Sequence, residues 1–184
     1  MTKPALPTKD RLIMSAATLF RTRGYHGVGL ADLLADANAP KGSLYHHFPN
    51  GKSDLALAAA TWASDEMLRL IAASFDGADS FEDGATTLCY KLAKLFDLTG
   101  WDTCPIAATL FEGPDNTLFR DHAEHIYEGW IAEVHDHAAR LGLSEEAAHA
   151  KAEHLFILIQ GGWSLARARR SSDILRGLIK RNDT

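Results

Sequence analysis

The sequence predicts an all-α protein, with an N-terminal three-helix helix-turn-helix domain followed by a larger helical domain. Three observations predict this. Apolar residues recur three and four residues apart along most of the 184-residue chain. Long stretches such as residues 53–75 contain neither Pro nor Gly. No segment alternates polar and apolar residues as a half-buried strand would. The boundary between the two predicted domains, residues 1–52 and 53–184, follows a short break at Pro49-Asn50-Gly51.

The first domain is predicted to contain two short helices behind a longer supporting one. The supporting helix begins near Thr8, the expected N-cap, and ends at Gly24. Residues 29–37 form a short second helix, the pair Asn38-Ala39 forms a turn, and a third helix starts at Pro40. This order is that of a helix-turn-helix with a supporting first helix.

The third helix carries the candidate binding site. Asn38 can cap it, and Pro40 suits its first turn. Leu44 and Phe48 lie four residues apart and share a buried face. Polar or small residues occupy the other faces, and a lysine begins the next helix: Lys41, Gly42, Ser43, Tyr45, His46 and Lys52. Such side chains can contact phosphates and base edges, and a helix N-terminus also favours an anion.

The charge is divided unevenly between the two predicted domains. Residues 1–52 carry seven Lys or Arg and three Asp or Glu, a net charge of +4, whereas residues 53–184 carry twelve and twenty-one, a net charge of −9. The basic excess therefore lies where DNA phosphates would need neutralising. No apolar run is long enough to span a membrane, and residues 1–10 lack a signal-peptide core, so we expect a cytoplasmic location and no membrane partner.

The second domain is predicted to consist of helices over residues 53–75, 81–98, 104–112, 116–141 and 144–170, with a last apolar stripe at 174–179. Ser144 and the acids after it suit a helix start. Within 144–170, apolar and small residues repeat at steps of four and three, the spacing of a helix that packs along another helix. The pair Gly161-Gly162 is either a tolerated defect or a point of close approach by a partner helix.

Two stretches resemble the DNA-binding domain of the TetR/AcrR family of bacterial repressors: AATLFRTRGYHGVGLADLLADA and KGSLYHHFPNGKSDL. The second, with Pro40 before it and Pro49-Asn50-Gly51-Lys52 within it, is most similar to the LmrA/YxaF-like subgroup. The stretch CPIAATLFE, residues 104–112, resembles a segment of that subgroup's second domain. The family usually has Thr or Ser where this chain has Gly29, and Ser is common at Pro40. Both departures remove a hydroxyl, which shifts the expected phosphate contacts towards Lys41, Tyr45 and Lys52.

The resemblance implies a ligand-responsive transcriptional repressor, without enzymatic activity or cofactor, that binds a pseudo-palindromic double-stranded DNA operator as a homodimer. A hydrophobic or aromatic small-molecule effector would release it. The predicted dimer contact comprises Leu155, Ile159, Gly162, Ala166, Ile174 and Leu178. The predicted ligand-binding residues are Trp62, Met67, Leu92, Phe96, Trp101, Phe111, His125, Trp130, Gln160 and Trp163. Of these, His125 and Gln160 are the expected polar anchors, and each tryptophan could equally be plain core.

Other classes of function have less support in the sequence. No Cys or carboxylate completes a metal-ligand set around the nine histidines, so no metal site is expected. Ser43 lies near His46 and His47, but a hydroxyl and imidazoles on a surface helix make no catalytic triad without an oxyanion site. A transcriptional activator or a helical protein-interaction adaptor stays open as an alternative, and the basic first domain argues against the adaptor.

Overall fold

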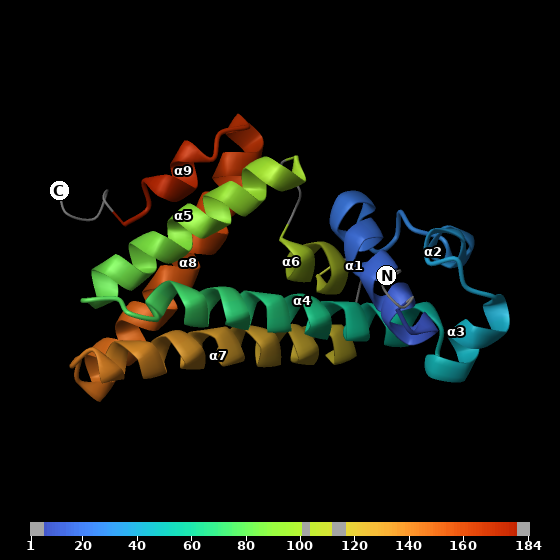
Figure 1. Ribbon diagram of the computed structural model, residues 1–184, viewed down its shortest axis with the longest axis horizontal. Helices are drawn as coiled ribbons and strands as arrows, with labels where there is room; N and C mark the ends of the chain where they lie inside the picture. Colours follow the sequence, from blue (N-terminus) through green and yellow to red (C-terminus); the bar gives the residue numbers. More distant parts are fainter. Residues whose placement is uncertain (1–5, 101–103, 112–116, 180–184) are drawn as a thin grey trace, which may run out of the picture. The chain divides into compact units, whose positions relative to one another are not determined.

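The computed structural model describes residues 6–100, 104–111 and 117–179, and the regular structure of these residues is entirely helical (Figure 1). The chain forms two compact units. Unit 1 comprises Met1–Ser64 and Pro105–Glu124, and unit 2 comprises Asp65–Cys104 and His125–Thr184. The first unit therefore extends past residue 52 and includes a segment from the middle of the chain.

Unit 1 is assembled around α1 (Thr8–Arg23). This helix packs against α2 (Leu30–Asp36), α3 (Lys41–His47) and α6 (Pro105–Leu110). The unit also contains the first turns of α4 (Lys52–Phe75) and of α7 (Thr117–Arg140). Apolar side chains from these helices and from the loops between them form its core: Leu12, Ala16, Phe20, Val28, Leu33, Leu44, Phe48, Leu55, Ile106 and Phe119. The N-cap of α1 is Pro7, which makes no side-chain capping bond, and not the expected Thr8, which is the first helical residue.

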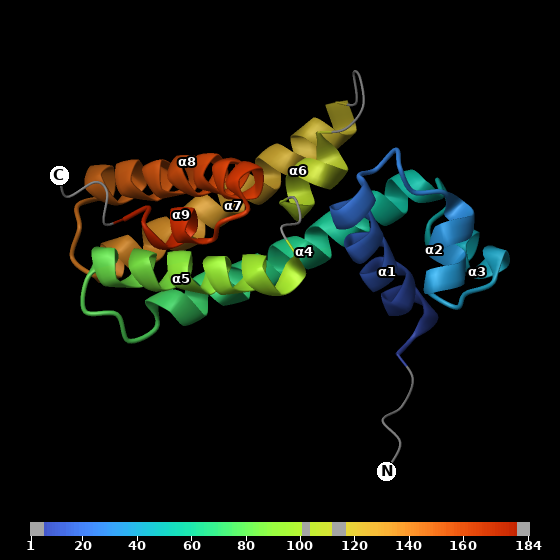
Figure 2. The ribbon, with the colours of Figure 1, turned by 90° about the horizontal axis from the view of Figure 1, so that it is seen from above.

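Unit 2 contains the later turns of α4 and α7 together with α5 (Phe81–Thr99), α8 (Glu145–Arg169) and α9 (Asp173–Arg176). The predicted start of α8 is confirmed, because the hydroxyl of Ser144 accepts a hydrogen bond from the N–H of Ala147 at 3.3 Å. Helix α9 lies against both α5 and α8 (Figure 2). It is shorter than the predicted stripe at 174–179, since the helix ends at Arg176.

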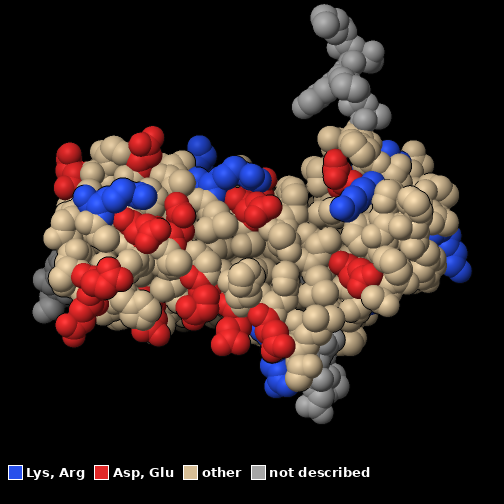
Figure 3. Space-filling model, turned by 90° about the horizontal axis from the view of Figure 1, so that it is seen from below, with Lys and Arg blue, Asp and Glu red and all other residues tan. Residues whose placement is uncertain are grey.

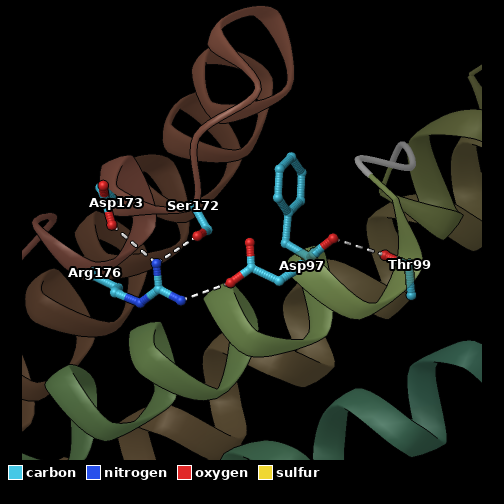
Figure 4. A network of polar contacts seen from close by, with 6 residues as sticks. Asp97, Thr99, Ser172, Asp173 and Arg176 are labelled. Carbon is cyan, nitrogen blue, oxygen red and sulfur yellow. Dashed lines mark hydrogen bonds and ion pairs between the residues drawn. The ribbon is translucent and has the colours of Figure 1, made fainter.

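One arginine fixes α9 to α5. The guanidinium of Arg176 donates to Asp97 at 2.7 Å, to Asp173 at 3.0 Å and to the hydroxyl of Ser172 (Figure 4). Hydrogen bonds from Ser172 and then Arg176 lower the pKa of the Asp97 carboxyl. Ile174 and Leu175 bury the apolar side of the same short helix. A four-residue helix is thereby held by tertiary contacts and not by its own propensity.

Two glycines allow close packing within unit 2. A Cβ on Gly84 would lie 2.2 Å from Cδ1 of Phe75, so only glycine lets that ring sit against α5. A Cβ on Gly162 would lie 2.8 Å from Cδ2 of Leu178. A close approach at Gly162 is therefore confirmed, but the neighbour is a side chain of the same chain and not a partner helix. A Cβ on Gly161 would meet nothing within 4 Å.

Candidate nucleic-acid interface

The turn between α2 and α3 is held by a side chain of α1. Arg11 donates from Nε to the carbonyl of Ala37 at 2.9 Å and from Nη2 to the carbonyl of Asn38 at 3.0 Å. Asn38 adopts a left-handed conformation with φ 45° and does not cap α3, contrary to the expectation. The N-cap is Pro40, in an extended conformation without a side-chain bond. The geometry of the turn is thus set by α1 through charge-assisted hydrogen bonds.

Helix α3 presents the predicted residues to solvent on a buried apolar base. Leu44 is 0% exposed and Phe48 is 4% exposed, as their spacing predicted. Lys41, Gly42 and His46 are exposed, Tyr45 is 43% exposed and Ser43 is half-buried. The helix therefore presents an ammonium, a phenol and an imidazole from a rigid base, the groups that can contact phosphates and base edges.

The break between α3 and α4 is also ordered by hydrogen bonds. The backbone N–H and the amide nitrogen of Asn50 both donate to the carboxylate of Asp54, at 2.9 and 3.0 Å. Gly51 has φ 65°, and a Cβ there would lie 3.3 Å from Cε1 of Tyr45. The phenol ring thus lies over this turn, and the turn leads directly into Lys52.

Lys52, the first residue of α4, lies against an aromatic ring that the sequence analysis did not single out. Its Nζ is 4.3 Å from the centroid of the Tyr25 ring. Tyr25 follows the end of α1 and is separated from Lys52 by 27 positions, so no periodicity in the sequence relates the two. Burial raises the pKa of the Tyr25 phenol, which therefore stays neutral near pH 7.

Acidic side chains are concentrated away from this site. On the face drawn in Figure 3, Asp and Glu gather over unit 2 and are sparse over α1 to α3. The local excess of positive charge thus accompanies the exposed face of α3, where a polyanion would bind. Within the described ranges, no helix is long and apolar enough to cross a membrane, and no three His, Cys, Asp or Glu side chains could hold a metal ion together.

Four of the predicted ligand-binding residues lie in the interior of unit 2: Leu92, Phe96, Trp130 and Trp163, each no more than 8% exposed. The rings of Phe96 and Trp163 meet edge to face at 5.3 Å between centroids, and Trp130 stacks on Phe156 at 5.8 Å. These contacts form an aromatic core. Three grooves on the surface of unit 2, one of them lined by Thr86, Tyr90 and Lys94, contain none of the predicted ligand-binding residues.

A polar cluster lies beside this aromatic core. Gln160, half-buried, places Nε2 4.0 Å from the sulfur of Cys104, and the hydroxyl of Tyr127 is 3.9 Å from the same sulfur. Burial first, and then Cys104, raise the pKa of the Tyr127 phenol. Tyr127 also packs edge to face on Trp130, with centroids 5.2 Å apart. Cys104 and Tyr127 were not predicted as site residues.

The remaining predicted ligand-binding residues do not join this core. Trp62 and Phe111 belong to unit 1, and Phe111 is 55% exposed because it follows the end of α6. His125 is exposed, since it lies about 100° around α7 from the buried Ile126. Met67 is half-buried in unit 2, and Trp101 lies outside the described residues.

The predicted dimer contact lies on the inner side of the protomer, so that prediction is wrong about which face is free. Helix α9 packs on α8, and Leu178, two residues past the end of α9, meets Gly162. The six predicted residues are all buried within their own chain: Leu155, Ile159, Gly162, Ala166, Ile174 and Leu178. The other side of α8 is exposed. There Ile157 is 63% exposed, Leu165 is 38% exposed, and Gly161 lies between them in open space.

Known proteins share both the sequence and the fold of this chain. Residues 12–59 match the family described as bacterial regulatory proteins, tetR family, and residues 82–181 match the C-terminal domain described as transcriptional regulator LmrA/YxaF-like. The HTH-type transcriptional regulator YxaF of Bacillus subtilis is 30% identical over 86% of this chain and 84% of its own.

Solved structures show the same architecture. A TetR transcriptional regulator from Legionella pneumophila matches with a TM-score of 0.83 and 20% identity over 98% of both chains. The regulator CifR, as a cysteine mutant in complex with 26-bp double-strand operator DNA, matches with a TM-score of 0.79 and 21% identity over 98% of this chain and 97% of its own.

Proposed function

The chain belongs to the TetR family of bacterial regulatory proteins and is a transcriptional regulator that binds operator DNA, not an enzyme, and we propose that it acts as a ligand-released, dimeric repressor. In this proposal it occupies a pseudo-palindromic operator in the cytoplasm, and a hydrophobic small molecule dissociates it from the DNA. One recognition helix reads few base pairs, so two copies related by a twofold axis are needed for a specific site.

The observation that carries the DNA-binding surface is the exposed polar side of α3 above the buried Leu44. In the proposal, Tyr45 and His46 contact base edges or flanking phosphates in the major groove. Lys41 and Lys52 contact the phosphate backbone. Ser43, which is half-buried, adds a hydroxyl at the same surface, and Gly42 leaves room for the close approach of a phosphate.

A gel-shift titration with DNA from the region upstream of the gene tests this surface. Lys52→Ala should weaken binding to specific and random duplexes alike. It should also reduce the magnitude of the slope of log affinity against log salt by about 0.9, the contribution of one phosphate contact. Lys94→Ala, an exposed lysine of unit 2, serves as the matched control and should leave the slope unchanged. A Lys52→Ala protein with altered sequence preference and the wild-type salt slope would contradict the assignment.

We place the dimer contact on the outer face of α8. Ile157, Gly161 and Leu165 are spaced four apart and lie along one side of the helix. Large exposed apolar side chains in a row indicate an interaction surface. The open space at Gly161 would let the helix backbone of a second copy approach closely, because no side chain intervenes.

We place the effector site in unit 2, at the aromatic core that contains Trp130 and Trp163. Gln160 and Tyr127 supply hydrogen-bonding groups there, as apolar ligand sites commonly require. Because these aromatic side chains are buried, a ligand would have to repack them.

Helix α4 runs without interruption from Lys52 to Phe75, so movement of its later turns, which carry Met67, would also move its first residue. A coupling of about 1–3 kcal/mol between ligand and DNA is enough for release.

Tryptophan fluorescence provides the assay for the effector. Hydrophobic and aromatic compounds that quench the tryptophan emission should also release the upstream DNA in the gel shift. Compounds that bind and quench without any effect on DNA affinity would contradict the proposed switch and would leave the DNA-binding function standing.

A further inference from the structure

One groove on unit 2 is lined by cationic and hydroxyl side chains. It has a volume of about 440 Å³ and runs along α5, with one side chain contributed by α9. None of the described residues that line it carries a carboxylate: Thr86, Thr87, Tyr90, Lys91, Lys94 and Arg176. Residues 53–184 have a net charge of −9, so a groove lined by three cations is a local exception to the acidic character of this domain.

Four of the lining residues share one face of α5: Thr87, Tyr90, Lys91 and Lys94. Their spacing is i, i+3, i+4 and i+7, which makes their side chains neighbours on the surface of a helix. The opposite side of the helix is anchored in the core of unit 2, where Leu92 is 0% exposed. The groove is therefore built on a rigid element and not on a loop.

Two cations of the groove have no carboxylate partner among the described residues. Lys94 is exposed and forms no ion pair with them, and Lys91 donates to the carbonyl of Ala73 at 2.6 Å, which leaves two of its three N–H donors. Asp97, the carboxylate three positions after Lys94, accepts from Arg176 at 2.7 Å (Figure 4). Two like charges that are neighbours on a helix repel each other, and an anion between them would relieve this repulsion.

The size and the remaining lining of the groove favour an organic anion. A water molecule occupies about 30 Å³ in the liquid, so an inorganic ion would leave most of the groove empty. Tyr90 is 45% exposed, and its ring offers an apolar wall beside the cations. Ligand sites commonly combine such a wall with a few polar groups that fix the orientation of the ligand.

We propose that this groove binds a small aromatic carboxylate, whose carboxylate lies between the ammonium groups of Lys91 and Lys94 and whose ring packs on Tyr90. The hydroxyls of Thr86 and Thr87 add hydrogen-bond donors at the same place, since neither bonds to another described residue. The site is separate from the effector site proposed at the aromatic core, and its occupation does not require DNA.

Isothermal titration calorimetry of the full chain with 2-naphthoate tests the site. Lys94→Gln should weaken binding about two- to five-fold, the loss expected for one exposed ion pair, and Tyr90→Leu about two- to ten-fold, the loss of an aromatic contact. Neither side chain is buried, so both variants should remain folded. Lys151→Gln, which removes an exposed lysine of unit 2 outside this groove, is the matched control and should leave the affinity unchanged.

The choice of probe separates the two parts of the proposed ligand. The neutral analogue 2-naphthamide should bind at least about five-fold more weakly than 2-naphthoate, and added salt should weaken the binding of 2-naphthoate alone. No binding of 2-naphthoate, or equal affinity in the wild-type and Lys94→Gln proteins, would overturn the proposal. Displacement of 2-naphthoate by an equal concentration of inorganic phosphate would show a site for any small anion and would overturn the assignment to an aromatic ligand. None of these results bears on the proposed binding of DNA, because no DNA is present.

Discussion

Replacement of Ile157 by glutamate tests the proposed dimer most directly. Ile157 is 63% exposed in the protomer, so that fraction of its surface is available for burial by a second copy. Complete burial of an isoleucine side chain contributes about 1.5–3 kcal/mol, so this fraction is worth about 1–2 kcal/mol. A twofold interface contains the residue twice, and Ile157→Glu should therefore cost about 2–4 kcal/mol of association free energy, before the desolvation of two carboxylates is added.

The corresponding dissociation constant of the dimer should rise about 30- to 1,000-fold, which sedimentation velocity over a range of protein concentrations can measure. Operator affinity should fall with the dimer. Leu98→Glu is the matched control, because Leu98 is 75% exposed on α5 and lies outside the proposed contact. Leu98→Glu should melt near the wild-type temperature, and Ile157→Glu should remain folded, since neither side chain is buried in the protomer. A monomeric wild-type protein, or an Ile157→Glu protein that dimerises as tightly as the Leu98→Glu protein, would refute the reasoning.

Three further predictions concern the stability of unit 2. Gly84→Ala should lower the free energy of unfolding by up to about 2 kcal/mol, because the new methyl group must displace the buried Phe75 ring by more than helix propensity returns. Gly129→Ala, within α7 and open to solvent, should raise the free energy of unfolding by up to about 1 kcal/mol. Urea unfolding of the two glycine variants should therefore give changes in this free energy of opposite sign. The hydrogen bond with Asp136 raises the pKa of His135. The stability that His135 contributes is therefore fully present below its unfolded pKa of about 6.5 and is lost as pH rises through its higher folded pKa. The difference in unfolding free energy between wild type and His135→Gln should shrink over that interval, and parallel pH curves would contradict this.

The periodicity of the sequence predicted which faces are buried, but not what buries them. In α8 the stripe that includes Leu155 and Ile159 was correctly identified as a packing face, and a second copy was wrongly assumed to cover it. The actual cover includes α9, a helix of four residues that depends on Arg176 and its acceptors, and Leu178 beyond its end. Side-chain contacts between distant segments leave no periodic signal, so a short helix held in this way can hardly be anticipated.

The proposed DNA-binding surface was more accessible to sequence reasoning, because its residues lie within one short segment. Leu44 and Phe48 define the buried side of α3, and the exposed residues follow by elimination. What the sequence did not reveal is the support for Lys52, since Tyr25 lies in a loop far away along the chain. The residues of a ligand site are the hardest to predict from the sequence, because an aromatic side chain in a helical bundle has the same pattern whether it packs in a core or lines a site.

Arg11 donates hydrogen bonds to the carbonyls of Ala37 and Asn38, so the residues that shape the helix-turn-helix differ from those proposed to contact DNA. The turn before α3 takes its shape from α1, and the position of α3 depends on the buried Leu44. His46 is exposed and takes part in neither contact. Operator preference can therefore diverge between relatives by substitution at a few exposed positions of α3 while the scaffold is inherited unchanged. The same arrangement makes this chain a suitable framework for engineering new operator specificities.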